Sequence, residues 1–335
     1  MKNEEFATAL STTSSTSTSS STSSSSSTSS TSSTSTPPRG GVRGGLFGLI
    51  GFPLGHSFSK GYFTEKFARE GIDAQYLNFE IPDASMLLDV IRDNPELRGL
   101  NVTLPHKQAV IPLLDELSDE AREIGAVNVI KIDPPQPSLK GREKGDVAGH
   151  RSLPLREGWG GSLKGFNSDI IGFMESIKPL LQPWHKKALV LGTGGASKAI
   201  CVGLKRLGIE WRYVSRNGGQ GAGSKEQENT SCPNNPLAPC PLPLAPLNYS
   251  DLTPEVMAEY TVIVNCSPVG MFPKVDAAPA IPYELLTPRH LLFDCVYNPE
   301  DTLFLKRGRE QGARGKNGLE MLHLQAEASW KFWNE

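Results

Sequence analysis

The chain has 335 residues, of which 38% are hydrophobic and 21% are charged. A chain of this length and composition can bury a large core and usually divides into two domains. Its 34 basic and 36 acidic residues leave a net charge of -2. There is therefore no electrostatic reason to expect nucleic acid or an anionic membrane as a partner, and chemistry on a small molecule is the expected class of function.

The cysteines and the start of the chain bear on cellular location. The five cysteines are odd in number and form no C-x-x-C pair, which argues against a metal site and against a disulfide framework. The start, MKNEEFATAL, has neither the apolar core of a secretory signal nor the arginine-rich composition of a transit peptide. No apolar run approaches the roughly 18 residues needed to span a bilayer. We expect a cytoplasmic protein without a metal.

Three stretches differ in composition from the rest of the chain. Every residue from Ser11 to Thr36 is Ser or Thr, and PPRGG follows. Such a composition cannot offset the entropy lost on folding, so residues 1–43 are predicted to form a disordered tail. Residues 133–163 and 217–247 lack periodicity and are rich in Gly, Pro and Ser, which predicts loops or insertions.

The remaining residues alternate between strand-like and helix-like patterns. In chain order we predict a strand at 45–52, a helix at 59–70 closed by Gly71, a strand at 74–81, a helix at 84–93, a strand within NVTLPHK (101–107), a helix from Pro105 through Leu117, a helix from Ile170, a strand at 187–191, a helix at 197–207 and a strand at 210–214. Strands that alternate with helices are typical of an α/β fold with a largely parallel sheet.

The stretch NVTLPHK carries the first candidate for chemistry. Alternation places Asn101 and Thr103 on one face of a strand, and Pro105 suits the first position of a helix. Lys107 would then lie in the first turn of that helix, where the macrodipole disfavours a cation. The lysine is therefore either a solvated side chain or one kept for a reaction.

A glycine cluster predicts a dinucleotide site. An apolar strand leads directly into Gly192-Thr193-Gly194-Gly195-Ala196, and a predicted helix follows. This order brings backbone N–H groups and a helix N-terminus against a pyrophosphate. The next strand ends in Ser215-Arg216 without an acidic residue, and an arginine there suits a 2'-phosphate, so NADP is expected in preference to NAD.

Eight motifs occur in the order expected of one enzyme family. They are GLIGFPLGHSFS, GLNVTLPHK, GAVNVI, GFNSD, LGTGGASKAI, VNCSPVGM, DCVYNP and NGLEMLHLQA. From about Gly44 to Trp333 the chain resembles the shikimate dehydrogenase family, which includes shikimate/quinate dehydrogenases. The resemblance implies an α/β substrate-binding domain (44–166 and 319–335) and a Rossmann-like NADP-binding domain (167–318).

The resemblance also implies an activity and roles for individual residues. It implies NADP-dependent interconversion of 3-dehydroshikimate and shikimate, a step of aromatic amino-acid biosynthesis, by a monomer or homodimer. Lys107 and Asp169 resemble the catalytic pair of the family. Asp169 also resembles a residue that binds the ring hydroxyls of the substrate. The residues similar to substrate ligands are Ser57 and Ser59 for the carboxylate, Tyr297 near it, and Asn101, Thr103, Asn128 and Gln325 for the ring hydroxyls. Those similar to cofactor ligands are Gly192, Gly194, Gly195, Ala196, Ser215, Arg216 and Gly318.

Elementary chemistry agrees with this assignment of Lys107. Reduction of a ketone by hydride places negative charge on the carbonyl oxygen, so a proton donor must stand within hydrogen-bond reach, and Lys107 can be that donor. Small uncharged polar groups suit a polyhydroxylated ring because each supplies directional hydrogen bonds.

Simpler interpretations stay open for several of these residues. Ser57 and Ser59 could cap the helix that follows, Asn128 could lie in a turn, and Asp169 could cap a helix. The sequence also departs from the family, because Lys60 stands where proline is usual and Arg216 is followed by NGGQGAGSKEQ, where Lys225 is the candidate for the second cation that the family usually has. Quinate as substrate, or a catalytically idle homologue that senses the ligand, are the alternative functions.

Overall fold

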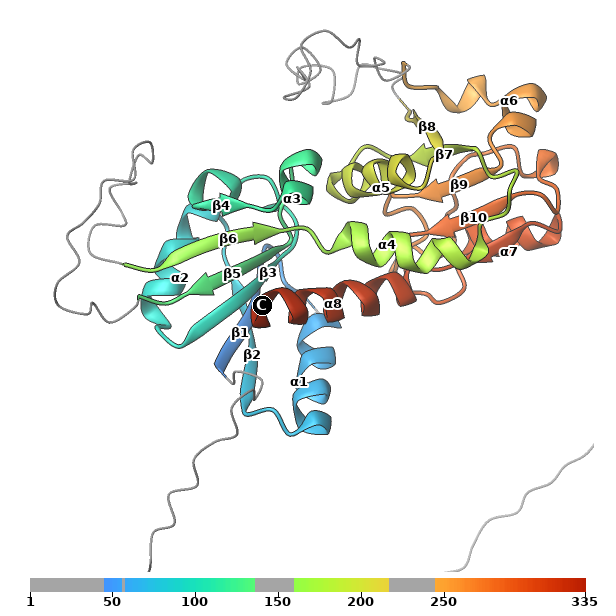
Figure 1. The fold of residues 1–335 in the computed structure, drawn as a ribbon. Coiled ribbons are helices and arrows are strands. Elements are labelled where there is room, and N and C mark those ends of the chain that lie inside the picture. The colour runs from blue at the N-terminus through green and yellow to red at the C-terminus, as the bar shows by residue number, and fades with distance from the viewer. Residues whose placement is uncertain (1–44, 56–57, 136–159, 217–244) are drawn as a thin grey trace, which may run out of the picture. The chain divides into compact units, whose positions relative to one another are not determined.

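The computed structural model describes residues 45–55, 58–135, 160–216 and 245–335, all within one unit that spans Val42–Glu335. The predicted tail at 1–43, most of the two predicted insertions and the residues His56 and Ser57 lie outside the described residues. The described strands form two sheets, one of six strands and one of five, and helices pack on both (Figure 1). The predicted α/β class is confirmed. Among the described residues, every helix is too short or too polar to cross a bilayer.

The first sheet is mixed rather than largely parallel. Its strands, in the order β2-β1-β3-β5-β6-β4, are β2 Ala74–Glu80, β1 Gly45–Gly51, β3 Leu97–Val102, β5 Val129–Asp133, β6 Ser162–Phe166 and β4 Glu116–Leu117. Strand β1 is parallel to β2 and β3, whereas β5 is antiparallel to both β3 and β6. The chain re-enters the sheet at the end where β3 leaves it. There the Val102 N–H donates to the Asn128 carbonyl at 2.9 Å. Strand β5 must therefore run back along β3. The prediction of a largely parallel sheet is wrong at this strand.

Alternation along β1 determines which helices cover each face of this sheet. Leu46 and Ile50 pack on one face with the apolar side of α2 (Leu87–Asp93), which follows a short 3-10 turn at Ala84–Met86. Phe47 and Leu49 pack on the other face against α1 (Phe58–Glu70) and the end of α8 (Leu319–Asn334). Both faces of the sheet are therefore covered by helices.

The tryptophans near the C-terminus belong to the core. The rings of Phe47 and Trp333 stack with centroids 4.9 Å apart, and the Trp333 indole N–H donates to the Ile130 carbonyl at 3.1 Å. Trp330 meets the edge of Phe47 at 5.2 Å. These contacts fasten α8 to the first sheet.

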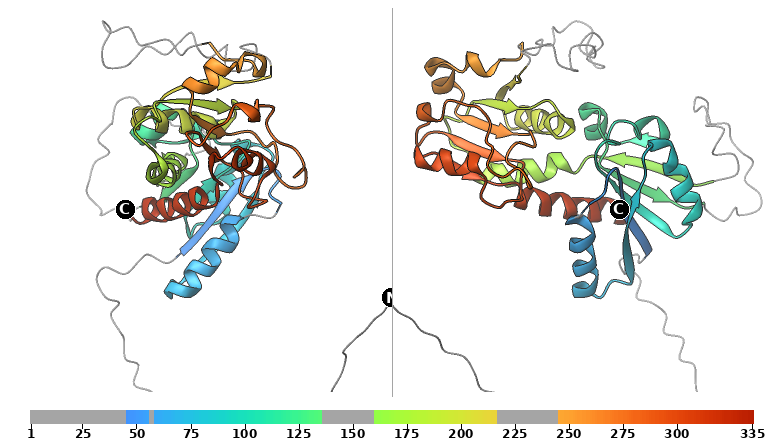
Figure 2. Two further views of the ribbon diagram at one scale, coloured as in Figure 1. Left: turned by 90° about the vertical axis from the view of Figure 1, so that its right-hand side faces the viewer. Right: turned by 180° about the vertical axis from the view of Figure 1, so that it is seen from behind.

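The second sheet is parallel throughout. Its strands, in the order β11-β10-β9-β7-β8, are β11 Arg314–Lys316, β10 Leu291–Asp294, β9 Val262–Asn265, β7 Lys187–Leu191 and β8 Glu210–Val214. Helices α4 (Asp169–Ile177) and α5 (Gly195–Arg206) cover one face, and α6 (Pro254–Glu259) and α7 (Leu303–Glu310) the other (Figure 2). Helix α5 begins two residues before the predicted start.

The strand order of this sheet predicts where a ligand binds. If the strands of this sheet are numbered 1 to 5 in chain order, their order in space from the β8 edge is 2-1-3-4-5. This is a doubly wound arrangement. The order reverses between β7 and β9. In such sheets the ligand crevice lies at this switch point, outside the carboxyl ends of the strands.

Candidate active site

A cavity of about 290 Å³ lies beside the carboxyl end of β3. It is lined by apolar and mostly uncharged polar side chains from β3, α1 and α8 and from the loops that follow β1 and β10. Lys107 is the only charged residue among the described residues that line it. The polar lining consists of Ser59, Asn101, Thr103, Lys107, Asn128, Tyr297, Gln325 and Ser329. The structure thus brings together seven of the predicted residues and adds Ser329.

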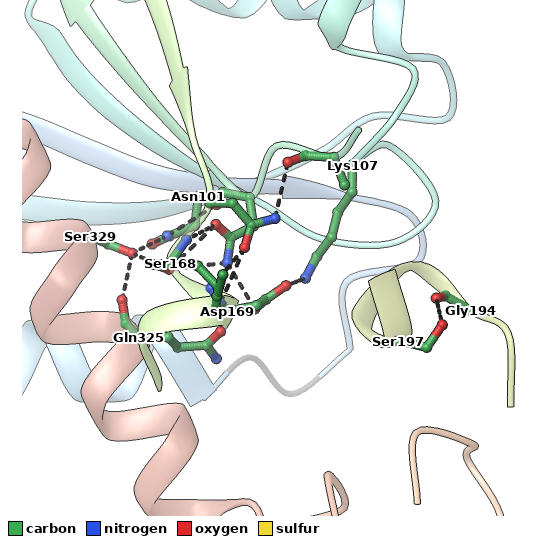
Figure 3. A network of polar contacts seen from close by, with 12 residues as sticks. Asn101, Lys107, Ser168, Asp169, Gly194, Ser197, Gln325 and Ser329 are labelled. Atoms are coloured by element: carbon green, nitrogen blue, oxygen red, sulfur yellow. Dashed lines mark hydrogen bonds and ion pairs between the residues drawn. The ribbon is translucent and has the colours of Figure 1, made fainter. Parts of the chain in front are cut away.

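Lys107 and Asp169 form an ion pair at this cavity. Lys107 Nζ lies 2.6 Å from Asp169 Oδ2, although the two residues are 62 positions apart in the chain (Figure 3). The side chains are only 15% and 5% exposed. A short, charge-assisted bond between two buried groups fixes the ammonium in one position at the cavity wall. Lys107 is therefore a positioned group and not a solvated lysine.

Lys107 does not lie in a helix, so the predicted helix from Pro105 through Leu117 is wrong. Residues 104–110 form successive turns, and a 3-10 turn at Ile111–Leu113 and strand β4 follow. An α-helix would need the Ile111 N–H to bond the Lys107 carbonyl. Instead the Ile111 N–H donates to the Gln108 carbonyl, and the Lys107 carbonyl accepts from the Val127 N–H at 2.7 Å. The lysine is thus held by the segment that leads into β5, and the macrodipole argument does not apply to it.

The Asp169 carboxylate is held from its other side by Asn128. Asn128 Nδ2 donates to Asp169 Oδ1 at 2.8 Å and to Ser168 Oγ at 3.0 Å, and Asn128 Oδ1 accepts from the Ser168 N–H at 2.7 Å. The amide is 4% exposed. Asp169 is not the cap of α4, because Asn167 Oδ1 accepts from the N–H groups of Asp169 (3.1 Å) and Ile170 (3.4 Å). The carboxylate is therefore available to the lysine.

Asn101 is the second buried amide in the cavity wall. The Tyr76 hydroxyl donates to Asn101 Oδ1 at 2.9 Å, and Asn101 Nδ2 donates to Ser329 Oγ at 2.9 Å. Burial raises the pKa of Tyr76, and a weaker opposing effect comes from a hydrogen bond with Ser59. Tyr76 therefore stays protonated across the working pH range and connects Asn101 to Ser59.

The remaining substrate candidates lie around the mouth of the cavity. Tyr297 is 36% exposed, and its ring meets the edge of Phe58 with centroids 6.0 Å apart. Ser59 is the second residue of α1, and Gln325 lines the cavity from α8. Ser57 lies outside the described residues, so its predicted contact with a carboxylate stays a prediction.

A second cavity, of about 600 Å³, lies at the switch point of the parallel sheet. The segments after β7, β8 and β9 line it, together with Tyr249 and residues 278–280. Gly192 has φ +98°, which favours glycine, and a Cβ there would lie 3.3 Å from Ser267. At Gly194 and Gly195 an added Cβ would meet nothing within 4 Å. Open space therefore lies in front of these backbones at the start of α5, as a pyrophosphate on a helix N-terminus requires.

Two predicted residues mark the outer part of this second cavity. Ser215 and Arg216 follow β8 and line it, and Arg216 is exposed. Burial raises the pKa of Tyr249, and the positive charge of Arg216 partly opposes that increase. Among the described residues that line this cavity, the end of β8 thus offers a cation and there is no carboxylate, which suits a phosphorylated ribose.

The other three cofactor candidates lie outside the lining of this cavity. Gly195 and Ala196 form the first turn of α5, beside Gly194. Gly318 precedes α8, and a Cβ there would come within 2.4 Å of the Cys295 carbonyl oxygen. Close packing against β10 therefore accounts for Gly318 without a cofactor.

Several residues that line the two cavities were missed in the sequence. Ser329 lies four residues after Gln325 on α8, and this spacing places both on one face of a helix, so the signal was present. Tyr249 lines the second cavity and Tyr76 bonds Asn101 from behind the cavity lining, and both come from positions with no motif of their own. Ser267, Pro268 and Val269 belong to the motif VNCSPVGM, which the family resemblance included without a role.

Similarity to known proteins extends over the residues that line both cavities. The sequence model "Shikimate dehydrogenase substrate binding domain" matches residues 49–130. A shikimate dehydrogenase (NADP(+)) of Desulforamulus reducens is 32% identical over 289 residues, which cover 85% of this chain and 88% of that protein. The chain belongs to the shikimate dehydrogenase family.

Solved structures of this family resemble the whole described chain. Shikimate 5-dehydrogenase of Listeria monocytogenes, in complex with shikimate and NAD, is 28% identical with a TM-score of 0.68 and covers 87% of this chain and 91% of its own. The enzyme of Thermus thermophilus, in complex with NADP(H) and shikimate, is 27% identical with a TM-score of 0.63 and covers 86% of this chain and 92% of its own. Family membership therefore extends past the matched domain to Asp169, Gln325 and the glycine cluster.

Proposed function

We propose that this chain is an NADP-dependent shikimate dehydrogenase that interconverts 3-dehydroshikimate and shikimate in aromatic amino-acid biosynthesis. The observation that carries the proposal is the Lys107–Asp169 pair, 2.6 Å apart, at a cavity otherwise lined by uncharged groups. An idle homologue would have no need to bury this pair. The relatives named above give the substrate and cofactor class.

In this proposal Lys107 and Asp169 handle the proton of the reaction. NADPH, when bound, supplies the hydride. The Lys107 ammonium donates a proton to the ketone oxygen as negative charge develops there, and in the reverse direction the neutral amine accepts it from the hydroxyl. Asp169, itself held by Asn128, keeps the ammonium aimed at the cavity. The two residues therefore act as one unit.

Uncharged polar groups recognise the rest of the substrate. Asn101, Thr103, Asn128 and Gln325 are proposed to bind the ring hydroxyls, and Ser57, Ser59 and Tyr297 the carboxylate. A hydroxylated ring is suited to such groups because they give directional bonds without a strong field. Binding a carboxylate through hydroxyl donors leaves Lys107 free for the reaction.

The second cavity fits the dinucleotide. Gly192, Gly194, Gly195 and Ala196 would receive the pyrophosphate at the start of α5, where unpaired N–H groups favour an anion. Ser215 and Arg216 would hold the 2'-phosphate of NADP, since an arginine pairs with a phosphate through two parallel hydrogen bonds. Gly318 is packed closely against Cys295, and its predicted contact with the cofactor stays a prediction.

The domain boundaries follow from the same division. We propose that residues 44–166 and 319–335 form the substrate-binding domain, that residues 167–318 form the NADP-binding domain, and that residues 1–43 are a separate tail. The two sheets support this division, because the first ends at Phe166 and the second ends at Lys316. We further propose a cytoplasmic enzyme that is a monomer or a homodimer.

Steady-state kinetics test the proposed function directly. The full chain is assayed for oxidation of shikimate and of quinate, each with NADP and with NAD. Turnover of shikimate with NADP, at the highest kcat/KM of the four combinations, is expected. A higher kcat/KM for quinate would make the chain a quinate dehydrogenase, and binding without turnover would make it a ligand sensor.

A further inference from the structure

Ser329 is a fully buried serine in the wall of the substrate cavity. It lies on α8, its exposed fraction is 0%, and its hydroxyl has three partners (Figure 3). Ser329 Oγ donates to the Gln325 carbonyl at 2.8 Å, accepts from Asn101 Nδ2 at 2.9 Å and lies 3.2 Å from Ser168 Oγ. A serine that only back-bonds to its own helix would need just the first of these.

The direction of each bond follows from the number of hydrogens. A serine hydroxyl carries one hydrogen and two lone pairs. The hydrogen of Ser329 goes to the Gln325 carbonyl, which can only accept. Ser329 Oγ must therefore accept from Asn101, and only Ser168 can supply a hydrogen to the contact between the two serines. Towards Asn101 it is an acceptor only.

This fixed direction selects one orientation of the Asn101 amide. On the other side of the amide stands the Tyr76 hydroxyl, which can donate or accept and would tolerate either orientation. Ser329 would not, because a rotated amide would turn its carbonyl oxygen towards an acceptor. The Asn101 amide therefore directs Nδ2 to Ser329 and Oδ1 to Tyr76.

The orientation determines what Asn101 offers to a substrate. Nδ2 uses one hydrogen on Ser329 and directs the other to the Asn128 carbonyl at 3.4 Å. Within the described part of the chain, Oδ1 accepts only from Tyr76, so one lone pair remains. Asn101 thus presents an acceptor and requires a donor, such as a hydroxyl, from its ligand.

Ser329 also joins Asn101 to the catalytic pair. Ser168 Oγ lies 3.2 Å from Ser329 Oγ and 3.4 Å from Asn128 Oδ1, and it accepts from Asn128 Nδ2 at 3.0 Å. The second Nδ2 hydrogen of Asn128 reaches Asp169, which in turn holds Lys107. A continuous series of polar contacts therefore runs from Asn101 to Lys107 through the hydroxyls of Ser329 and Ser168.

We propose that Ser329 is a positioning residue that sets the Asn101 amide so that its carbonyl oxygen accepts a substrate hydroxyl. The proposal rests on the dehydrogenase function proposed above. Loss of the Ser329 hydroxyl leaves only the longer bond to the Asn128 carbonyl, at 3.4 Å, to hold this orientation, so the amide can rotate more readily. A rotated amide turns its N–H groups towards a hydroxyl that must donate. Because this bond exists in both ground and transition states, its loss raises KM more than it lowers kcat.

The test compares Ser329→Ala with a matched control. Ser176 on α4 is also 0% exposed and donates to a carbonyl of its own helix, Phe173 O at 3.0 Å, but has no contact with the network. Ser329→Ala is expected to raise KM and the calorimetric Kd for shikimate about tenfold, the effect of one buried hydrogen bond, with kcat within a few-fold of wild type. Ser176→Ala should leave KM, Kd and kcat unchanged, while circular dichroism shows both variants folded at the assay temperature.

A double-variant cycle separates positioning from a general structural effect. In an Asn101→Ala background there is no amide to orient, so adding Ser329→Ala should change Kd by less than twofold. An unchanged Kd in Ser329→Ala, or a tenfold effect that persists in the Asn101→Ala background, would overturn the proposal. Absence of shikimate turnover in the wild type would instead refute the proposed function, and the calorimetric comparison would still decide the role of Ser329.

Discussion

Replacing Lys107 by alanine removes the proposed proton donor without touching the rest of the cavity. The side chain has one described ion-pair partner, Asp169, and the backbone is anchored separately through the bond from Val127 to its carbonyl. Alanine keeps that backbone bond. The substitution therefore tests the ammonium group and leaves the turn at 104–110 in place.

The expected effect falls on kcat. General acid/base groups typically contribute about 10²- to 10⁴-fold, so kcat for shikimate oxidation should fall by that factor. KM for shikimate should change far less, because the proton moves in the transition state and not on binding. Stability should fall as well, since removing one partner of a buried ion pair costs about 3–5 kcal/mol.

A second buried lysine controls for that loss of stability. Lys66 is 5% exposed and pairs with Glu327 (2.9 Å) and Glu70 (3.0 Å) on the outer side of α1, away from the cavity lining. Lys66→Ala should lower the melting temperature but leave kcat near the wild-type value. Assays are run below the transition of the least stable variant.

The double variant with Asp169→Asn tests whether the two groups act as a unit. Asp169→Asn alone should lower kcat, because a neutral amide no longer fixes the ammonium. In the double variant, the loss of kcat should be far smaller than the product of the losses in the two single variants. A wild-type kcat in Lys107→Ala, or a raised KM with kcat preserved, would refute the catalytic role of Lys107.

Three further predictions concern the cofactor, the tail and pH. Arg216→Ala should raise KM for NADP roughly 10- to 100-fold and that for NAD only slightly, since only NADP carries the 2'-phosphate; equal effects would mean that the phosphate is bound elsewhere. Deleting residues 1–43 should leave kcat and melting temperature unchanged, because a Ser/Thr run has no apolar surface to bury; a loss of several degrees would contradict this. Burial raises the pKa of Asp294 from 3.8 to about 6. The folded state therefore binds this proton more tightly than the unfolded state, so the contribution to stability is greatest below pH 4 and falls by about 3 kcal/mol as pH rises to 6. Denaturant titrations from pH 4 to 7 should show this fall in the wild type and its absence in Asp294→Asn, and parallel curves would refute it.

Local patterns in the sequence predict several elements of the fold. Strand β7 at Lys187–Leu191 and strand β8 at Glu210–Val214 match the predicted bounds. Strand β7 reads as a short apolar run because it is buried within a parallel sheet. Helix α1 ends at Glu70, where Gly71 takes φ +64° as expected of a helix-terminating glycine. These elements depend on spacing that the sequence displays directly.

Long-range hydrogen bonds override the local pattern elsewhere. The residues from Pro105 to Leu117 have helical spacing, but the Val127 N–H takes the Lys107 carbonyl and a helix becomes impossible there. Antiparallel β5 has the same origin, since it depends on where the chain returns to β3. A periodic pattern contains no information on a partner 20 residues away.

The site shows the same division between local and long-range information. Lys107 and Asp169 could be named because they stand in separate motifs, whereas the bonds that orient Asn101 come from Tyr76 and Ser329, which stand in none. Ser329 is a helical serine among apolar neighbours and resembles Ser176 in sequence context. Only the contact of its hydroxyl with Asn101 distinguishes the two.

Helices α4 and α8 connect the substrate cavity to the cores of both sheets. Helix α4 begins at Asp169, beside the cavity, and its later residues Phe173 and Ile177 pack in the core of the second sheet. Helix α8 has Met321 in that same core and Trp333 in the core of the first sheet, with Gln325 and Ser329 between them. Buried apolar residues therefore anchor both helices, and the position of Asp169 relative to Gln325 and Ser329 depends on the packing of these two helices.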